Sequence, residues 1–330
     1  MTSAPRRDRD TVSFSSSAGD QPTQSTACSR GILRRAVVWL ALLIVGLAAL
    51  ACGMLGLLGW VASGQVLHPT SAPDAGLPSH YPTLKPQNVT VAGTNGTLLA
   101  GRFFPGRTTA TIILSHGYGA TQDQMLPWAN FLHQAGFSVF TYDMRGCGQS
   151  SGSITFGALE QRDLISVVDY LVARPDVDKA KIGTLGFSMG GATTIMAAAQ
   201  DTRIKAVVDD SGYADIRHWF NTSIGELLRH PTDPFSILSL KMVEWRAGID
   251  ADSLRPSAKI ALISPRPVLI IQGTADHDLS LNNSQENFAA AKQPKELWWV
   301  PGATHGQTLE HAGAAYVRRV VGFFSQALHP

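Results

Sequence analysis

The sequence predicts an α/β domain: a mostly parallel central sheet flanked by helices, with a small helical cap insertion and an N-terminal transmembrane helix. Short apolar runs such as TIILS (111–115) and PVLIIQ (267–272) alternate with amphipathic segments, as in parallel strands that helices cover on both faces. A long uncharged stretch precedes this alternation, and residues 212–262 interrupt it. These three features set the expected order of the elements.

The first 62 residues predict a tail followed by a membrane span. Residues 1–35 are rich in Ser, Thr and Arg and hold few apolar side chains, which is typical of a disordered segment. Residues 36–62 contain no charged residue, and about 20 apolar residues suffice to cross a bilayer core. The alternative is a signal peptide cleaved near residues 62–64, although its apolar core would usually be shorter, about 7–15 residues.

The charges that flank the span predict its orientation. Arg30, Arg34 and Arg35 directly precede it, whereas the next Lys or Arg is Lys85. The positive-inside rule therefore puts the N-terminus in the cytoplasm and the rest of a single-pass protein outside it. Residues 63–87 hold five prolines and are predicted to form an extended stalk.

The remainder, 88–330, is predicted to be the α/β domain. Its strand candidates, in chain order, are Val89–Val91, Leu98–Phe104, Thr111–Ser115, Ser138–Tyr142, Lys181–Gly186, Ala206–Asp209, Val268–Gln272 and Leu297–Val300. Apolar residues recur at helical spacing from Leu164 to Leu171 and from Tyr316 to Leu328. Residues 212–262 hold aromatic side chains without alternation; they are either a cap whose apolar face lines a pocket or a peripheral helical segment.

Composition excludes several classes of protein. A formal net charge of +2 without a dense basic stripe argues against a nucleic-acid partner. The three cysteines form no CxxC pair, so the common zinc and redox motifs are missing and no cofactor is expected. The sequence does not predict the oligomeric state.

One serine stands in a pattern that makes serines reactive. Gly186-Phe-Ser188-Met-Gly190 follows an apolar strand and precedes the helix-forming run ATTIMAAA. In this setting a sharp strand-to-helix turn holds the serine outward, and the flanking glycines allow close packing. The helix N-terminus also stabilises developing negative charge. Ser188 is the predicted nucleophile.

A serine hydroxyl needs a neighbouring base, and His305 is the predicted one. It follows an apolar strand and precedes the last helix, so it should lie at the same edge of the sheet as Ser188. His116 also ends a strand, but it comes too early for the chain order serine, acid, histidine. His277 adjoins the candidate acids and is a poor choice for the base.

The imidazole needs an acid that fixes its tautomer, and two aspartates follow the strand VLIIQ. Asp276 is favoured because it comes first after the turn, and Asp278 is the alternative. An oxyanion would accept hydrogen bonds from the backbone N–H groups of Met189 and of Tyr118, in the loop after TIILS.

Together these residues resemble the α/β-hydrolase superfamily over about residues 88–328. The resemblance rests on five motifs: HGYG at 116–119, DMRGCGQS at 143–150, GFSMG at 186–190, GTAD at 273–276 and THG at 304–306. Within the superfamily it looks like the bacterial peptidase- and esterase-like members and like the membrane-anchored group that includes acyl-protein and monoacylglycerol hydrolases. The resemblance implies Ser188, Asp276 and His305 as catalytic triad, and it implies a structural role for Asp143 and Arg145.

The expected activity is hydrolysis of a carboxylic ester or thioester through an acyl-enzyme. Serine peptidase or amidase activity on the same fold is the first alternative, and a non-catalytic binding protein is the second. The expected partners are a small-molecule or lipid-like acyl substrate and, through residues 36–62, the membrane.

Overall fold

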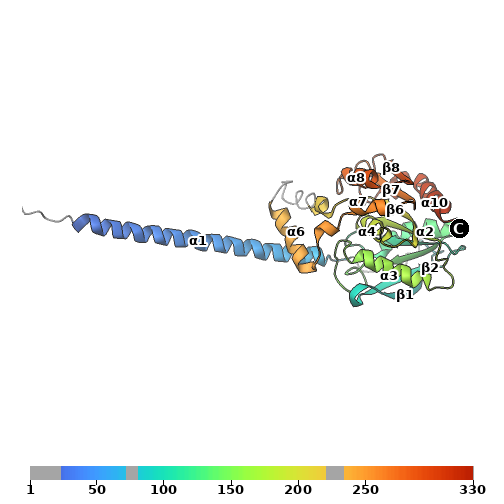
Figure 1. Cartoon of the computed structure of the whole chain (residues 1–330). Coiled ribbons are helices and arrows are strands. Elements are labelled where there is room, and N and C mark those ends of the chain that lie inside the picture. The colour runs from blue at the N-terminus through green and yellow to red at the C-terminus, as the bar shows by residue number, and fades with distance from the viewer. Residues whose placement is uncertain (1–23, 72–80, 221–233, 330) are drawn as a thin grey trace, which may run out of the picture. The chain divides into compact units, whose positions relative to one another are not determined.

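The computed structural model describes residues 24–71, 81–220 and 234–329. The chain forms two compact units that divide between Leu57 and Leu58. The first helix, α1 (Gln24–Leu67), begins in the first unit and ends in the second (Figure 1). All other described elements belong to the second unit.

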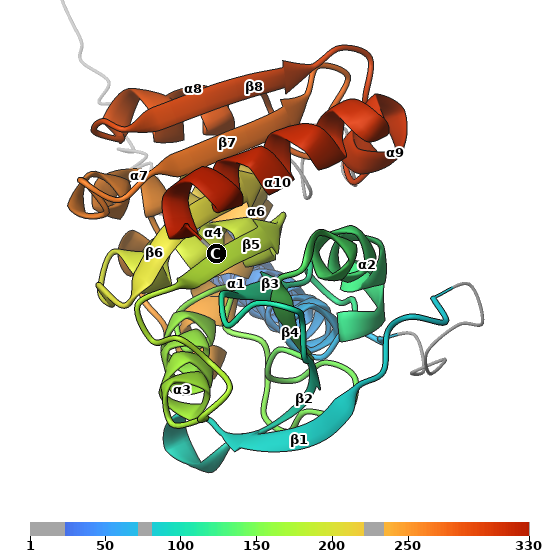
Figure 2. The same cartoon turned by 90° about the vertical axis from the view of Figure 1, so that its right-hand side faces the viewer.

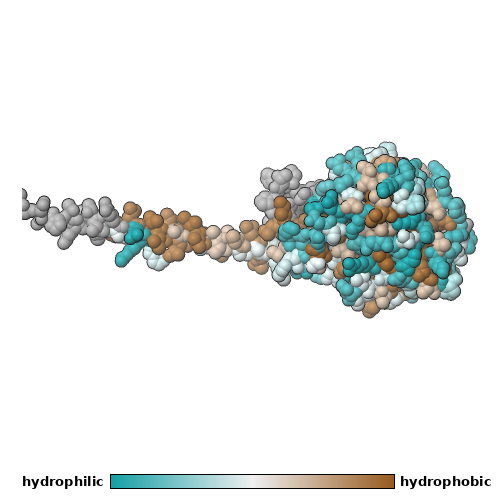
Figure 3. Space-filling model, viewed as in Figure 1, coloured by the Kyte–Doolittle hydropathy of each residue, from teal (hydrophilic) through white to brown (hydrophobic). Residues whose placement is uncertain are grey.

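Helix α1 is longer than the sequence pattern predicted. It already includes residues 24–35, so the prediction of a disordered tail is wrong there, while residues 1–23 lie outside the described part. Once the apolar run has formed a helix, the extension of the helix by one residue costs little free energy, because nucleation is the unfavourable step. Residues 24–35 contain no proline that would end the helix. Its part Gly31–Leu67 is apolar and long enough to cross a membrane, and Figure 3 shows hydrophobic side chains along it.

The beginning of the predicted stalk is also helical. Residues 63–67 form the last turn of α1 and belong to the second unit, in which Ser63 and Leu67 are buried. The Leu67 carbonyl accepts a hydrogen bond from the Ile154 N–H at 3.3 Å. The prediction of an extended stalk is therefore wrong for residues 63–67. The apolar side chains of Val66 and Leu67 give the helix a face that the domain buries. Residues 72–80 lie outside the described part.

An eight-stranded sheet forms the centre of the second unit. The strands are β1 (Gln87–Ala92), β2 (Leu98–Phe104), β3 (Thr111–Ser115), β4 (Ser138–Tyr142), β5 (Ile182–Phe187), β6 (Ile204–Asp210), β7 (Val268–Gly273) and β8 (Lys295–Val300). Their order is β1-β2-β4-β3-β5-β6-β7-β8. Only the β1–β2 and β2–β4 pairs are antiparallel, so the prediction of a mostly parallel sheet is confirmed, with strand ends shifted by two residues at most.

Helices cover both faces of this sheet (Figure 2). They are α2 (Leu126–Ala135), α3 (Glu160–Val172), α4 (Met189–Ala198), α7 (Pro256–Lys259), α8 (Asn282–Ala290), α9 (Thr308–Ala312) and α10 (Ala314–Leu328). Successive residues of β3 show why the strands are apolar throughout: Ile112 and Leu114 pack with α2 and α10, whereas Ile113 packs with α3 and α4. Neither face of a central strand therefore meets water.

The interruption at residues 212–262 is helical. It contains α6 (Pro234–Ala247), α7 and two 3₁₀ turns at Ala251–Ser253 and Ile260–Leu262, while residues 221–233 lie outside the described part. Two further 3₁₀ turns, Thr94–Gly96 and Gln122–Met125, lie in earlier loops.

Candidate active site

The backbone at Ser188 is a strained turn between β5 and α4. Ser188 has φ 53° and ψ −119°, a conformation that a non-glycine residue rarely adopts. A Cβ on Gly186 would lie 2.1 Å from the Gly190 carbonyl oxygen, and one on Gly190 would lie 2.2 Å from the Ser115 carbonyl oxygen. Only glycine fits at either position, so the flanking glycines permit the turn that holds Ser188 outward.

His305 lies beside this turn. It is in the loop between β8 and α9, and its Nε2 is 3.0 Å from Ser188 Oγ. Its Nδ1 is 2.8 Å from Asp276 Oδ2. A proton on Nδ1 would face the carboxylate, which leaves Nε2 to accept the serine proton. The imidazole also packs against the Phe187 ring, with 4.9 Å between the ring centroids.

Asp276 is itself held in place. Its Oδ1 accepts the Leu279 N–H at 2.9 Å, its Oδ2 accepts Gln272 Nε2 at 3.3 Å, and its side chain is fully buried. Asp278 is exposed and lines the adjoining pocket. The structure thus brings Ser188, His305 and Asp276 together, while their chemical roles stay a prediction.

Three carboxylates act on the charge of the His305 imidazole. Burial alone lowers the pKa of His305, but the hydrogen bond and charge of Asp276 oppose this effect, and so do the charges of Asp278 and Asp210. The carboxylates outweigh burial, so the pKa of His305 is raised above its usual value. A more basic imidazole is a better proton acceptor for a serine.

The other two histidines weighed from the sequence do not act here. His116 is fully buried; its Nδ1 donates to the Gly117 carbonyl at 2.7 Å, and its Nε2 accepts the Met144 N–H at 2.9 Å. Both ring nitrogens are thus hydrogen-bonded, Nε2 to a second loop, and burial lowers the pKa of His116. His277 is exposed.

Tyr118 and Met189, the predicted oxyanion donors, lie next to the serine turn. Met189 follows Ser188 as the first residue of α4, where backbone N–H groups have no partner within the helix. Tyr118 lines the same pocket as Ser188, and its hydroxyl donates to the Val66 carbonyl at 2.7 Å. The preceding N–H, of Gly117, is already bonded to Gln124 Oε1 at 2.8 Å. The oxyanion role of the Tyr118 and Met189 N–H groups stays a prediction.

Sequence reasoning missed Asp210, at the end of β6. Its carbonyl accepts the Ser188 N–H at 2.8 Å, so it supports the strained turn directly. Its carboxylate accepts hydrogen bonds from Thr308 Oγ1 at 2.6 Å, Tyr316 hydroxyl at 2.7 Å and Ser211 Oγ at 3.0 Å. The available signal was the pair of acids that follows the apolar run Ala206–Val208 at the end of β6.

The neighbouring acid, Asp209, is much less well satisfied. It is fully buried, and its carboxylate has a contact of 3.5 Å from Asn287 Nδ2. Burial, followed by the charge of Asp210, raises the pKa of Asp209 to about 7. Asp209 also leaves no space at Gly191, where a Cβ would lie 2.1 Å from Asp209 Oδ1.

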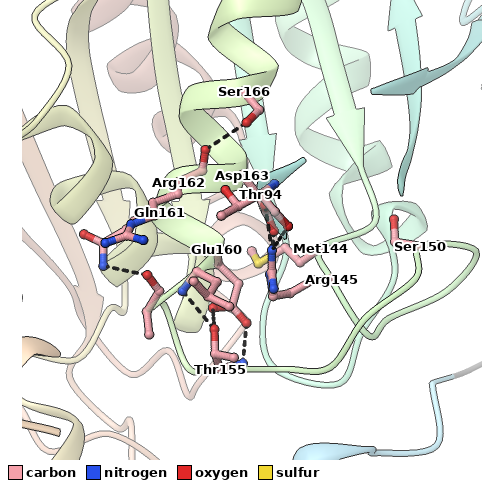
Figure 4. A network of polar contacts seen from close by, with 12 residues as sticks. Thr94, Met144, Arg145, Ser150, Thr155, Glu160, Gln161, Arg162, Asp163 and Ser166 are labelled. Atoms are coloured by element: carbon pink, nitrogen blue, oxygen red, sulfur yellow. Dashed lines mark hydrogen bonds and ion pairs between the residues drawn. The ribbon is translucent and has the colours of Figure 1, made fainter. Parts of the chain in front are cut away.

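Asp143 and Arg145 make the structural contacts that the resemblance implied. Arg145 Nε and Nη2 bind the two oxygens of Asp163 at 2.6 and 2.8 Å, and Asp163 Oδ1 also accepts the Thr94 N–H at 2.7 Å (Figure 4). Asp143 accepts two loop N–H groups, from Gln122 at 2.7 Å and from Gln149 at 2.9 Å. Asp143, at the end of β4, thus binds two loops, and Arg145 links its own loop to α3; neither side chain lines the pocket.

The pocket beside Ser188 has a volume of about 370 Å³, within the usual range for small-molecule sites. Its lining residues are Gly117, Tyr118, Gln124, Phe187, Ser188, Trp219, Asp278, Leu279 and His305. Trp219 comes from the helical interruption and packs against Tyr118, with 5.4 Å between ring centroids. One wall is therefore aromatic. Among the described residues, no three His, Cys, Asp or Glu side chains gather in a way that could hold a metal ion.

Comparison with known proteins agrees with this architecture. Residues 126–330 match the prolyl oligopeptidase family. The chain is 28% identical over 253 residues to the uncharacterized protein YfhR of Escherichia coli O157:H7, covering 74% of this chain and 82% of that protein. Its fold is similar to the Pyrococcus furiosus esterase Pf2001 (TM-score 0.67, 22% identity, 80% of this chain and 98% of the other). It is also similar to a dienelactone hydrolase from Anabaena variabilis (TM-score 0.56, 19% identity, 74% and 99%).

Proposed function

Because the chain belongs to the prolyl oligopeptidase family, with an α/β-hydrolase fold, we propose that it is a serine hydrolase that cleaves a carboxylic ester or thioester. The observation that carries the proposal is the unbroken contact from Asp276 through His305 to Ser188. A serine becomes nucleophilic when a base accepts its proton and an acid orients that base.

The residues suggest the following course of reaction. Ser188 Oγ attacks the carbonyl carbon while His305 Nε2 takes the hydroxyl proton. The oxyanion accepts hydrogen bonds from the Tyr118 and Met189 N–H groups. As the tetrahedral intermediate collapses, His305 returns the proton to the departing alcohol or thiol. Water, deprotonated by the same imidazole, then attacks the carbonyl carbon of the acyl-enzyme. The bond to Ser188 Oγ breaks, the imidazolium returns its proton to Oγ, and the acid leaves.

The pocket favours a substrate with an apolar part. Tyr118, Phe187 and Trp219 present rings next to Ser188, and the burial of an apolar group against them contributes about 25 cal/mol per Å². A small-molecule or lipid-like acyl group fits this chemistry. The leaving group of an ester or thioester needs less help from a proton than an amine does, which favours these substrates over amides.

Amide or peptide hydrolysis is the second candidate, and the family match favours it. The same three residues would act, with His305 protonating the departing amine. A matched pair of substrates that share one acyl group, an ester and an amide, separates the two by their ratio of kcat/KM. A non-catalytic binding protein would bind both without turnover.

We further propose that α1 anchors the protein in a membrane, with the N-terminus in the cytoplasm and the catalytic domain outside it. The apolar helix and the arginines before it support this orientation. Protease added to intact cells should digest the catalytic domain while an N-terminal tag stays protected. Protection of the catalytic domain instead would reverse the orientation.

The nucleophile is tested with the full chain in detergent, using a fluorophosphonate that labels reactive serines. We expect Ser188→Ala to abolish labelling and to reduce ester turnover by about 10⁴-fold or more. Ser166→Ala, on α3, is the control, because its Oγ donates to the helix carbonyl of Arg162 and Ser166 does not line the pocket. Equal labelling of Ser188→Ala and the wild type would overturn the proposal.

A further inference from the structure

We propose that α6 is a membrane-surface helix: together with the last turns of α1 it lies in the headgroup region of the bilayer and holds the catalytic domain against it. This inference rests on the proposed anchoring through α1 but goes beyond it. An anchor alone would leave the domain free to stand away from the lipid.

Apolar side chains are exposed on α6 to an unusual degree. Among the described residues after α1, the large hydrophobic side chains that are exposed are Leu98, Ile237, Leu238, Trp245 and Leu262. Three of these belong to α6: Ile237 is 62% exposed, Leu238 39% and Trp245 72%. Exposed apolar side chains that gather on one element mark a surface for a partner or a membrane.

The exposed residues form an outer face, opposite to the one that packs on the domain. Leu240 and Val243 are buried in the core, as in any helix that covers a domain. Leu238 and Trp245 are seven residues apart, two helical turns, and therefore share a different face. Lys241, three residues after Leu238 and four before Trp245, is exposed on the same face, and its long side chain can reach a lipid headgroup. A helix between a domain and water has a polar outer face, so the largely apolar outer face of α6 predicts an apolar environment.

Helix α6 packs directly on the last turns of α1 (Figure 1). The Trp245 and Trp60 rings are 5.9 Å apart between centroids. The Arg246 guanidinium lies 4.0 Å from the centroid of the Trp60 ring, and its Nη1 donates to Ser63 Oγ at 2.9 Å. The outer face of α6 is thus continuous with the end of the proposed anchor.

The spacing of tryptophans along α1 gives the depth of this junction. Trp39 and Trp60 are 60 − 39 = 21 residues apart, which corresponds to about 32 Å along a helix. A hydrocarbon core is about 30 Å thick, and tryptophans concentrate at its two boundaries. Trp60 therefore lies at the outer boundary, and Trp245, which packs against it, lies at the same depth.

The lipid surface fits this face better than a protein partner does. Trp60, which packs against α6, is itself exposed, and so are its neighbours Leu58 and Val61 on α1. A protein that covered α6 would have to cover this surface too, in a region where lipid headgroups and acyl chains already surround the helix. The bilayer covers both without any further component.

The same junction brings the pocket close to the membrane. Val66, in the last turn of α1, accepts the hydrogen bond of the Tyr118 hydroxyl, and Tyr118 lines the pocket beside Ser188. A lipid-like substrate could therefore pass from the bilayer surface to the nucleophile over a short path. This consequence rests on the proposed hydrolase activity.

Lipid contact is tested with the full chain in nanodiscs, after replacement of Cys28, Cys52 and Cys147. Single cysteines at Ile237→Cys and at Leu262→Cys carry an environment-sensitive fluorophore. Leu262, 65% exposed and on a 3₁₀ turn, is the matched control. We expect spin-labelled lipids to quench the label at 237 at least about threefold more strongly than the label at 262, as in depth-dependent burial of an interfacial helix.

A third label, at Leu47→Cys in α1, separates failure of this inference from failure of the anchor. Quenching at 47 with equally weak quenching at 237 and 262 would overturn the inference and keep the anchor. No quenching at 47 would overturn both. A blue shift at 237 without quenching by lipid would show that a protein, such as a second copy of the chain, covers α6, and would also overturn the proposal.

A second measurement uses turnover. The double variant Leu238→Glu, Trp245→Glu should hydrolyse an ester embedded in vesicles at least about fivefold more slowly, yet keep its rate on a soluble ester. Leu262→Glu should change neither rate. An unchanged rate on embedded ester would contradict the inference. If both rates fall together, α6 is needed for the fold, and the quenching at 237 decides.

Discussion

The edge of the sheet around Ser188 and the junction of α6 with α1 are built in opposite ways. At the sheet edge, polar and charged side chains that are buried (Asp276) or half-buried (Ser188 and His305) are joined by hydrogen bonds of about 3 Å. At the junction, large apolar side chains such as Trp245 face outward and pack by their rings. Hydrogen bonds depend on direction and apolar contacts on area. Small changes should therefore matter greatly at the edge and little at the junction.

The largest effect that this contrast predicts is at Asp276. Asp276→Asn changes one atom but replaces an acceptor of the His305 Nδ1–H by an amide that can donate, and so disturbs the tautomer that leaves Nε2 free. We expect kcat to fall about 10⁴-fold. Asp278→Asn, two residues away and exposed, should lower kcat less than about fivefold. A large loss in Asp278→Asn together with a small loss in Asp276→Asn would mean that Asp278 is the orienting acid.

A second test compares how two adjacent carboxylates at the sheet edge, Asp209 and Asp210, affect the stability of the folded protein. Asp209 has a folded-state pKa of about 7, raised by burial, whereas the pKa of an unfolded aspartate is about 3.9. The folded protein therefore keeps a proton that the unfolded chain releases, and stability contributed by this group falls as the pH rises from about 4 to 7. Asp209→Asn removes that loss.

Thermal unfolding at pH 5 and pH 8 checks this prediction. The melting temperature of Asp209→Asn, relative to the wild type, should be higher at pH 8 than at pH 5. Asp210→Asn should destabilise at both, because it disturbs the hydrogen bonds from Thr308 and Tyr316. A pH-independent difference for Asp209→Asn would contradict the shifted pKa.

An intermediate effect is expected at Tyr118, where the two regions meet. Burial, with the charge of Cys147, raises the pKa of Tyr118 to about 12, so the hydroxyl remains a donor to the Val66 carbonyl. Tyr118→Phe removes this bond, worth about 1 kcal/mol, but keeps the ring packing. If the bond positions the backbone N–H for the oxyanion, kcat should fall about fivefold with little change in KM. A change confined to KM would show that Tyr118 only lines the pocket.

A smaller effect is expected in the pH profile. The charge of Asp278 helps to raise the pKa of His305, and the imidazole must be neutral to accept the serine proton. Asp278→Asn disfavours the imidazolium and lowers this pKa, so the acid limb of kcat/KM should move to lower pH. Because Asp278 is exposed and its charge is screened by solvent, we expect the shift to be small. A shift to higher pH would contradict the assignment of His305.

The smallest effect is expected at the junction. Trp245→Phe keeps an apolar ring on the outer face of α6, so turnover of a vesicle-embedded ester should change less than about twofold. This variant is the conservative control for the double variant Leu238→Glu, Trp245→Glu. A loss in the phenylalanine variant as large as in the glutamate variant would show that the junction depends on specific geometry, and would break the contrast.

Much of the fold could be predicted because its signals are local. Each central strand is a short apolar run, and every one of the eight predicted strands is present. The serine turn can be recognised from two glycines within five residues. The order serine, acid, histidine along the chain then leaves few candidates for the acid and the histidine. Catalytic residues that are defined by their type and by their position at a strand end can be recognised from the sequence.

What only the tertiary structure decided involves residues that are distant in sequence. No local pattern links Asp210 with Thr308 and Tyr316, or Tyr118 with Val66. These hydrogen bonds depend on the order of the strands and on the path of α1, which the sequence pattern does not give. The sequence alone determined which side chains can react, since that depends on their chemical type. The folded chain decided what supports them, because hydrogen bonds and apolar contacts form between whichever groups the packing brings within a few ångströms.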